Sequence, residues 1–325
     1  MRTLLLTLLL LASARSEAFL FFGGSRDRAA EAALEQARAA YAAGDCQTAL
    51  QKADGLLAGK PPSAVREGAY ALMGPCYETS GAADKAIGLY RLALGLYPDN
   101  IVFSSRLADI YNRSGFYENA VPLLLKVLNL RPGDLGATLG LARAYSSLGF
   151  LSKAKDYYSK TAALQNFGDA GLLEEYARCM LRKRDWDESL FLAGKGAALS
   201  PRSAVWPLVE ARVAAGRGDY YAAVASMERA MRFSDARRLR MERALYLLLG
   251  GLPRRAADAA EAELSSAPED PLASAIKGMA LYSLGERAPA GAYFKAAEKG
   301  GGFTARLAGA FLKGPGSTGE AACAK

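Results

Sequence analysis

Small residues recur along this chain at intervals of about 34 residues. One column of the alignment of these intervals holds only Ala or Gly, at Ala37, Gly74, Ala108, Ala142, Ala177, Ala211, Ala244 and Gly278. A second column holds Ala49, Ala86, Ala120, Ala154, Ser189, Ala223, Ala256 and Ala290. Self-similarity at a fixed period of this length is typical of a stack of repeated supersecondary units. The period therefore constrains the fold more than any other feature.

The residues between and after these columns indicate what each unit is. Between the columns lie Gly44, Gly81, Gly115, Gly149, Arg184, Gly218, Gly251 and Gly285, and most units close with proline, at Pro61, Pro98, Pro132, Pro201 and Pro268. Glycine can leave a helix through a left-handed conformation, and proline cannot continue one. Small residues let two helices approach closely, and large apolar residues fill the space between layers. We expect each unit to be two helices joined by a glycine turn.

This pattern resembles the tetratricopeptide repeat family, whose 34-residue unit has the same small residues, turn glycine and closing proline. The resemblance implies an all-α, right-handed superhelical solenoid of about eight helix-turn-helix units over residues 30–302. Several features depart from the pattern. They include Arg184 and Ser189 in the fifth unit, Asp235 in place of a closing proline in the sixth, and a longer link, AGKPPSAV, between the first two units.

A last helix is expected after the repeats. Residues 303–314 place Phe303, Leu307 and Phe311 on one helical stripe, as a helix that caps the final unit would. Residues 315–325 have the composition of a loose tail.

The first residues have the pattern of a targeting signal. Arg2 precedes an apolar run, and small residues then offer processing sites after Ala14 and after Ala18. We predict a signal peptide over residues 1–18, a short linker over 19–29, and an exported protein that is periplasmic or secreted. The alternative is an uncleaved anchor, and only in that case do we expect contact with a membrane.

Composition argues against catalysis. The chain has no histidine, and its four cysteines show no metal-binding spacing. We therefore predict no enzyme activity, no metal site and no cofactor. The net charge is +8, but the aromatic residues lie in packing columns and are not interleaved with exposed basic residues, so we do not expect nucleic-acid binding.

The resemblance implies that the first helix of each unit lines the binding groove. Outward positions on these helices give a groove with a basic centre and an apolar C-terminal end. Its candidate residues are Asp109, Arg113, Arg143, Arg178, Arg182, Arg212, Leu245, Met279 and Tyr282. Such a surface suits an extended peptide or protein segment that carries carboxylates. The alternative is a solvated helix face in which the arginines pair with Glu174, Glu175 and Glu210.

Cys46 and Cys76 are expected at the same end of adjacent layers. They could form a disulfide in an oxidising compartment, or each could pack as a small apolar residue, and both readings stay open.

Together these features predict a non-enzymatic, exported protein-binding scaffold, of the kind that the resemblance connects with assembly of envelope, pilus or secretion complexes. The alternative is a polysaccharide-binding or accessory subunit of an envelope enzyme complex.

Overall fold

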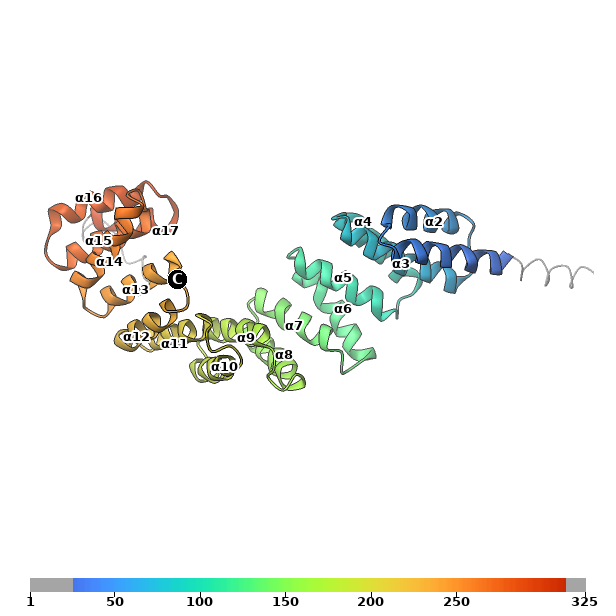
Figure 1. The fold of residues 1–325 in the computed structure, drawn as a ribbon, viewed down its shortest axis with the longest axis horizontal. Coiled ribbons are helices and arrows are strands. Elements are labelled where there is room, and N and C mark those ends of the chain that lie inside the picture. The colour runs from blue at the N-terminus through green and yellow to red at the C-terminus, as the bar shows by residue number, and fades with distance from the viewer. Residues whose placement is uncertain (1–25, 314–325) are drawn as a thin grey trace, which may run out of the picture. The chain divides into compact units, whose positions relative to one another are not determined.

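The computed structural model describes residues 26–313, which form α-helices and turns and, within that range, no strand. The helices follow one another through short connections (Figure 1). In chain order they are a helix over residues 26–42, α2 (Cys46–Ala58), α3 (Ser63–Thr79), α4 (Ala83–Leu96), α5 (Ile101–Arg113), α6 (Tyr117–Leu130), α7 (Leu135–Ser147), α8 (Leu151–Leu164), α9 (Ala170–Lys183), α10 (Trp186–Leu199), α11 (Val205–Gly216), α12 (Tyr220–Met231), α13 (Arg237–Leu249), α14 (Pro253–Ser266), α15 (Pro271–Ser283), α16 (Arg287–Glu298) and α17 (Gly302–Lys313). The predicted all-α repeat array is confirmed.

The chain divides into two compact units, which we call unit 1 (residues 1–157) and unit 2 (residues 158–325), with the boundary inside α8. Within each unit, helices that are neighbours in the chain pack against each other. Odd-numbered helices also contact one another, α5 with α7 in unit 1, and α9 with α11 and α13 with α15 in unit 2. The first helices of these successive pairs therefore lie side by side.

Left-handed backbone conformations connect the two helices of each pair. The seven turn glycines have φ between +74° and +86°. Arg184, which replaces glycine in the fifth pair, adopts the same region with φ of +59°. An L-residue pays a steric cost there that glycine does not, so the repeat geometry is kept at this turn despite the substitution.

The small columns are where helices approach most closely. Every alanine in both columns is fully buried. A Cβ added at Gly74 would come within 2.2 Å of the Tyr90 hydroxyl, and one at Gly278 within 2.8 Å of the Phe294 ring. Ser189 fits the second column because its hydroxyl donates to the Asp185 carbonyl at 2.8 Å, one turn earlier. Its polar group is thus satisfied inside the buried layer.

Side-chain caps begin many of the helices. Asp45, Asn100, Asp134, Asp169, Asp219 and Asp270 each accept a hydrogen bond from a backbone N–H in the first turn that follows. These bonds satisfy donors that a helix start leaves without an intrahelical acceptor.

The N-terminal end corrects one prediction. Residues 26–29, which we assigned to the linker, are helical. The cause is local: no glycine or proline lies between Gly24 and Gly44, and alanine, a strong helix former, occupies positions 29 and 30. The Arg26 guanidinium also donates to the Gly59 carbonyl at 2.8 Å.

At the C-terminal end, α17 covers the last helix pair. Phe311 stacks on Phe294 with ring centroids 4.8 Å apart and meets the Tyr282 ring edge-on at 5.3 Å. The side chains of Phe303 and Leu307 lie outside the described part of the structure, as do residue 314, the signal segment 1–18, residues 19–25 and the tail 315–325. Among the described helices, none has both the length and the apolar character to cross a membrane.

Candidate partner-binding site

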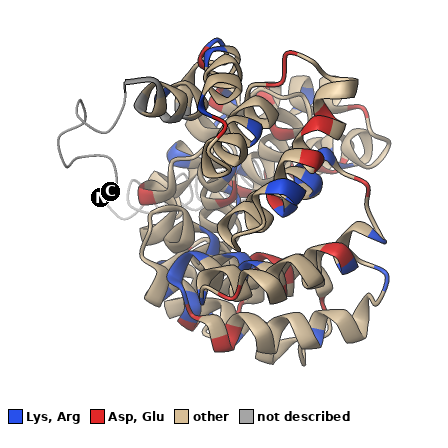
Figure 2. Cartoon of the chain, turned by 90° about the vertical axis from the view of Figure 1, so that its left-hand side faces the viewer, with Lys and Arg blue, Asp and Glu red and all other residues tan. Residues whose placement is uncertain are grey.

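The candidate groove residues divide between the two units. Asp109 and Arg113 lie on α5 and Arg143 on α7, all in unit 1, whereas the other six lie on α9, α11, α13 and α15 of unit 2. Each set lies on the odd-numbered helices, the layer that the resemblance assigns to the groove. Figure 2 marks the lysines and arginines together with the acidic residues on the ribbon.

In unit 1 the basic residues gather around one carboxylate. Glu78 of α3 accepts a hydrogen bond from Arg113 Nη2 at 3.1 Å and one from the Tyr90 hydroxyl at 2.7 Å, and Arg106 Nη1 lies 3.8 Å away. Burial, and then the bond to Glu78, raise the pKa of Tyr90. Arg106 and Arg113 therefore share one carboxylate, which neutralises part of the positive charge on this face.

Asp109 lies among the same charges. Desolvation by the surrounding protein raises the pKa of this exposed carboxyl, Arg113, Arg106 and Arg143 act in the opposite direction, and Glu78 adds to the increase. The unit 1 face thus carries acidic and basic groups close together.

Unit 2 contains a pocket of about 380 Å³ lined by Arg178, Leu181, Arg182, Trp186 and Arg212. The first three lie on α9, within about one turn of each other. Trp186 begins α10, and Arg212 comes from α11. The structure thus brings together three of the predicted arginines with an aromatic and an aliphatic side chain. Such a pocket offers planar N–H donors for a carboxylate and an apolar wall beside them.

The arginines of this pocket differ in how they are held. Arg212 Nε and Nη2 donate to the two oxygens of Glu242 at 2.8 and 2.9 Å, and the Tyr246 hydroxyl donates to the same carboxylate at 2.7 Å. Arg178 pairs with Glu174 of its own helix and is 66% exposed. Because the Arg178 pair is exposed and confined to one helix, it costs less to exchange for another partner than the half-buried pair of Arg212 with Glu242.

The pKa shifts agree with this division. The hydrogen bonds that Arg212 donates to Glu242 raise the pKa of Arg212 against the opposing effect of burial. Burial alone would raise the pKa of Glu242, but the bonds from Arg212 and Tyr246 outweigh it and lower that pKa. Both groups are therefore charged at neutral pH and neutralise each other.

The apolar residues expected at the C-terminal end differ in their surroundings. Leu245 and Tyr282 are each 36% exposed. Met279 packs against the buried clusters around Ile276 and Phe294, and Tyr282 contacts Phe311 of α17. The capping helix thus takes part of the surface that we expected a partner to use.

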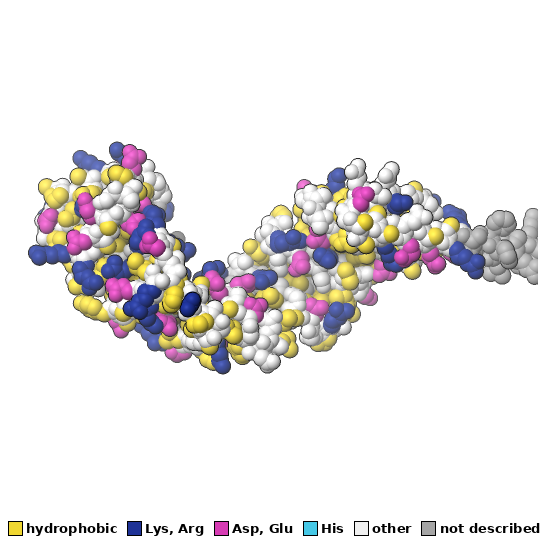
Figure 3. Space-filling view, viewed as in Figure 1, with side chains coloured by type: hydrophobic (Ala, Val, Ile, Leu, Met, Phe, Trp, Pro, Cys, Tyr) yellow, Lys and Arg dark blue, Asp and Glu magenta, His cyan; other side chains and the backbone are white. Residues whose placement is uncertain are grey.

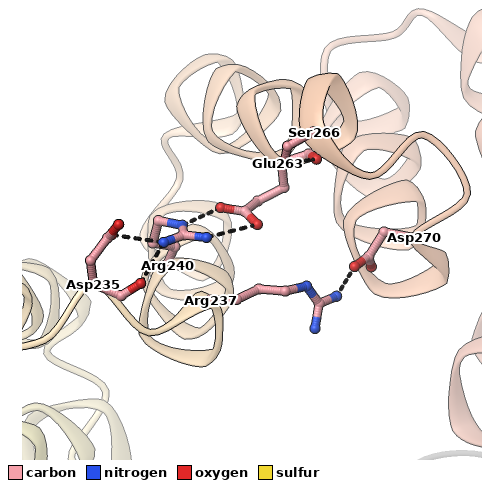
Figure 4. Close-up of polar contacts among 6 residues, drawn as sticks. All are labelled: Asp235, Arg237, Arg240, Glu263, Ser266 and Asp270. Carbon is pink, nitrogen blue, oxygen red and sulfur yellow. Dashed lines mark hydrogen bonds and ion pairs between the residues drawn. The ribbon is translucent and has the colours of Figure 1, made fainter.

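A network of ion pairs lies next to this region (Figure 4). Arg240 of α13 donates to both oxygens of Glu263 on α14 and to the carbonyl and carboxylate of Asp235, and Arg237 pairs with Asp270 at the start of α15. Glu263 is 5% exposed. Asp235 stands where other units have a closing proline, so hydrogen bonds from Arg240 hold this connection where a proline ring would otherwise restrict it.

Cys46 and Cys76 are joined in a disulfide with Cα atoms 5.2 Å apart. It links the first turn of α2 to the last turns of α3. Cys179 is a buried thiol on α9, and Cys323 lies outside the described residues. Within residues 26–313, no group of three or more Cys, Asp or Glu side chains is arranged to hold a metal ion.

Trp186, Leu181 and the Arg212–Glu242 pair were missed by the sequence reasoning. The sequence does hold a signal for Trp186: it is the first residue of the second helix in the fifth unit, two positions after Arg184, which replaces the turn glycine there. The Arg212–Glu242 pair spans 30 positions, which requires knowing how one layer sits on the next. Arg212 therefore joins α11 to α13 through Glu242, and it also lines the pocket.

Across the visible surface, basic and acidic side chains are interspersed with apolar ones on the helices of both units (Figure 3). This pattern is usual for an exposed helix face. It makes a local cluster of arginines with an aromatic side chain, as in the α9–α11 pocket, more informative than the net charge.

No family model and no curated protein matches the chain. Solved structures do. A tetratricopeptide repeat protein from Parabacteroides merdae is 18% identical, with a TM-score of 0.59 over 76% of this chain and 97% of its own. MamA from Desulfovibrio magneticus RS-1 is 19% identical, with a TM-score of 0.50 over 53% of this chain and 94% of its own. At these identities the likeness concerns the fold. With its helix pairs, turn glycines and buried alanine columns, the chain has the tetratricopeptide repeat fold.

Proposed function

We propose that the protein is a non-enzymatic scaffold that binds a peptide or protein segment through the α9–α11 pocket. The observation that carries this proposal is the meeting of Arg178, Arg182 and Arg212 with Leu181 and Trp186 around about 380 Å³. A carboxylate of the partner would be bound by Arg178 and Arg182, while an adjacent apolar side chain packs on Trp186. Arg212, which Glu242 holds in place, would form the α11 side of the pocket.

A peptide array tests this function. Random peptides with free C-termini and their C-terminally amidated counterparts are probed with the purified chain and with the double variant Arg178→Glu/Arg182→Glu. We expect the chain to select peptides with carboxylates next to apolar residues. Loss of charge-assisted hydrogen bonds worth about 1.5–3 kcal/mol each should weaken the selected peptides at least tenfold in the variant. Amidation distinguishes a terminal carboxylate from a side-chain carboxylate.

The matched control is Arg91→Glu/Arg254→Glu, which makes the same change of charge at exposed positions on α4 and α14. Equal weakening by both double variants would mean that net charge alone drives binding. Selection of acidic glycans in preference to every peptide would favour the polysaccharide-binding alternative.

We also propose that the protein is exported, with the signal segment removed after Ala14 or Ala18, and that its partner belongs to an envelope assembly such as a pilus or secretion complex. The Cys46–Cys76 disulfide supports export, since such bonds persist in oxidising compartments. N-terminal sequencing of the protein from its native cell tests the cleavage. A start at Arg15 or Phe19 agrees with it, and a start at Met1 would mean an anchored protein.

A further inference from the structure

A cavity of about 980 Å³ lies at the N-terminal end of unit 1, between the helix over residues 26–42, the C-terminal half of α2 and the connection that follows it. Most of its lining is apolar or small, contributed by Ala29, Ala30, Ala33, Gly55, Leu56, Gly59, Pro61 and Pro62. Arg26, Asp27, Gln36, Lys52 and Lys60 complete the lining. We call it the N-terminal groove.

Elsewhere in the chain, surfaces of small residues are covered by aromatic rings. The ring of Trp206 lies on Gly196, and the ring of Trp186 lies on Gly216, each so close that an added Cβ would come within 2.5 Å. The rings of Tyr90 and Phe294 lie in the same way on Gly74 and Gly278. The N-terminal groove, with three alanines and two glycines in its wall, is a surface of this kind without a described ring on it.

The opposite end of the array shows how this chain covers a terminal pair. There α17 supplies Phe311, which packs between Phe294 and Tyr282. A terminal repeat has a neighbour on one side only, so its other apolar surface needs a cap.

The chain has a suitable apolar segment next to the N-terminal groove. Phe19, Leu20, Phe21 and Phe22 precede Gly23 and Gly24, and the described chain begins two residues later at Arg26, which itself lines the groove. Two adjacent glycines allow the backbone to reverse direction.

The length of this segment also fits. Phe21 lies five residues before Arg26, which gives a reach of at most about 17 Å at roughly 3.5 Å per residue. The groove wall on the first helix extends from Arg26 to Gln36, about 15 Å at 1.5 Å per residue. Segment and groove are therefore matched in length as well as in chemistry.

We propose that Phe19–Phe22 folds back at Gly23-Gly24 and inserts its apolar side chains into the N-terminal groove, so that the segment caps the first helix pair as α17 caps the last. The segment directly follows Ala18, one of the two expected cleavage positions. The inference does not depend on the proposed partner site, which lies in unit 2.

Photo-crosslinking tests the position of the segment. The chain beginning at Phe19 is made with the substitution Phe21→p-benzoylphenylalanine and irradiated at low concentration, and the links are mapped by mass spectrometry. We expect links within one molecule to residues 29–36 or 52–62. Links between two copies would assign the groove to a second chain, and links elsewhere or none would place the segment outside it, so each of these results would overturn the proposal.

Hydrogen exchange tests whether the segment stabilises this end of the molecule. The variant Phe21→Ser/Phe22→Ser should increase exchange at least threefold in peptides from residues 26–36 and 52–60, and leave α16 and α17 unchanged. The control Phe116→Ser/Phe150→Ser removes two phenylalanines that are each 55% exposed on other turns and should leave the groove peptides unchanged. Unaltered exchange in the first variant would contradict a capping role even if the chain folds normally.

Discussion

Unit 1 keeps glycine at each turn between paired helices, whereas unit 2 replaces one of these glycines with Arg184. Ion pairs join layers in both units: Arg106 and Arg113 of α5 contact Glu78 of α3 in unit 1, and Arg212 of α11 contacts Glu242 of α13 in unit 2. Unit 1 has in addition a disulfide between α2 and α3, and unit 2 has ion pairs that join α13 to α14 and to Asp270 just before α15. The buried alanine columns are the same in both. The comparison indicates that small residues at matching heights define the repeat, and that the fastening between layers is free to vary.

The same comparison separates two arginine faces. In unit 1 the carboxylate of Glu78 contacts Arg106 and Arg113. In unit 2, Arg212 of the pocket pairs with Glu242 of the next layer, and Arg178 pairs with Glu174 of its own helix. The arginines of unit 1 thus share one carboxylate, whereas those of unit 2 line a candidate binding pocket.

The largest loss of stability is expected when the disulfide of unit 1 is reduced. Cys46 and Cys76 are 30 residues apart, and opening a loop of that length costs about 3.5 kcal/mol in the chain-entropy model. We expect a reductant to lower the denaturant midpoint of unit 1 and to increase exchange in α2 and α3, with α9–α17 unaffected. The Cys46→Ala/Cys76→Ala variant serves as the control because a reductant should not change it further. An identical effect of reductant on both proteins would contradict this role.

Breaking the principal ion pair of unit 2 should have a smaller effect. The substitution Arg240→Met leaves the buried Glu263 carboxylate without its guanidinium, and partial access of water near Arg240 limits the expected loss to about 2 kcal/mol. Hydrogen exchange should increase in α13 and α14 but not in unit 1. Arg217→Met is a suitable comparison, since its partner Asp187 is almost fully exposed and the pair should contribute little.

Two acidic residues should respond to pH with opposite signs. The pKa of Glu242 is lowered in the folded state, so the stability it provides is present above its unfolded pKa and is lost as pH falls through the folded value. Glu242→Gln should therefore cost unit 2 about 1–2 kcal/mol near pH 7, and less near pH 3.

The pKa of Asp109 is raised in the folded state, so its ionisation begins to oppose folding as the pH rises above the unfolded pKa, and the cost is complete above the folded pKa. Asp109→Asn should slightly stabilise unit 1 near pH 7 and have no such effect near pH 3. Melting curves of both variants across this pH range check the two signs together. The same sign for both would show that the surroundings of the two carboxyls do not differ as described.

The smallest effect comes from exchanging turn residues between the units. Arg184→Gly relieves a left-handed arginine and should stabilise unit 2 by about 0.5–1 kcal/mol after the entropy of the unfolded glycine is counted. Gly149→Arg makes the reverse change in unit 1 and should destabilise it by a similar amount. The changes in the free energy of unfolding should have opposite signs in the two variants. If both variants are destabilised, Arg184 makes contacts that outweigh the cost of its left-handed backbone.

The fold was predictable from sequence because its determinants are local and periodic. The turn glycines and the alanine columns identify each helix pair before any contact is known, and the resemblance supplies the stacking. Residues 26–29 were assigned to a linker although they are helical, because the repeat columns begin only at Ala37 and say nothing of how far the first helix extends before them.

The pocket was only half predictable. Arg178, Arg182 and Arg212 follow from their helical positions, but the neutralisation of Arg212 by Glu242 and the contribution of Trp186 depend on how layers meet. The contact between Tyr282 and Phe311 likewise depends on where the capping helix lies. Periodicity says which side chains share a face, and packing decides which of them stay available.

Crosslinking of a bound peptide tests most directly that the α9–α11 pocket, and not the Asp109 face, is the binding site. A carboxylate-bearing peptide selected on the array is made with a benzophenone beside its carboxylate, irradiated in complex with the chain, and the links are mapped. If the α9–α11 pocket binds the peptide, we expect links to residues 170–190 and 205–216. These links should disappear in Arg178→Glu/Arg182→Glu and persist in Arg91→Glu/Arg254→Glu. Links that fall within residues 101–147 of unit 1, and survive both substitutions in α9, would contradict it.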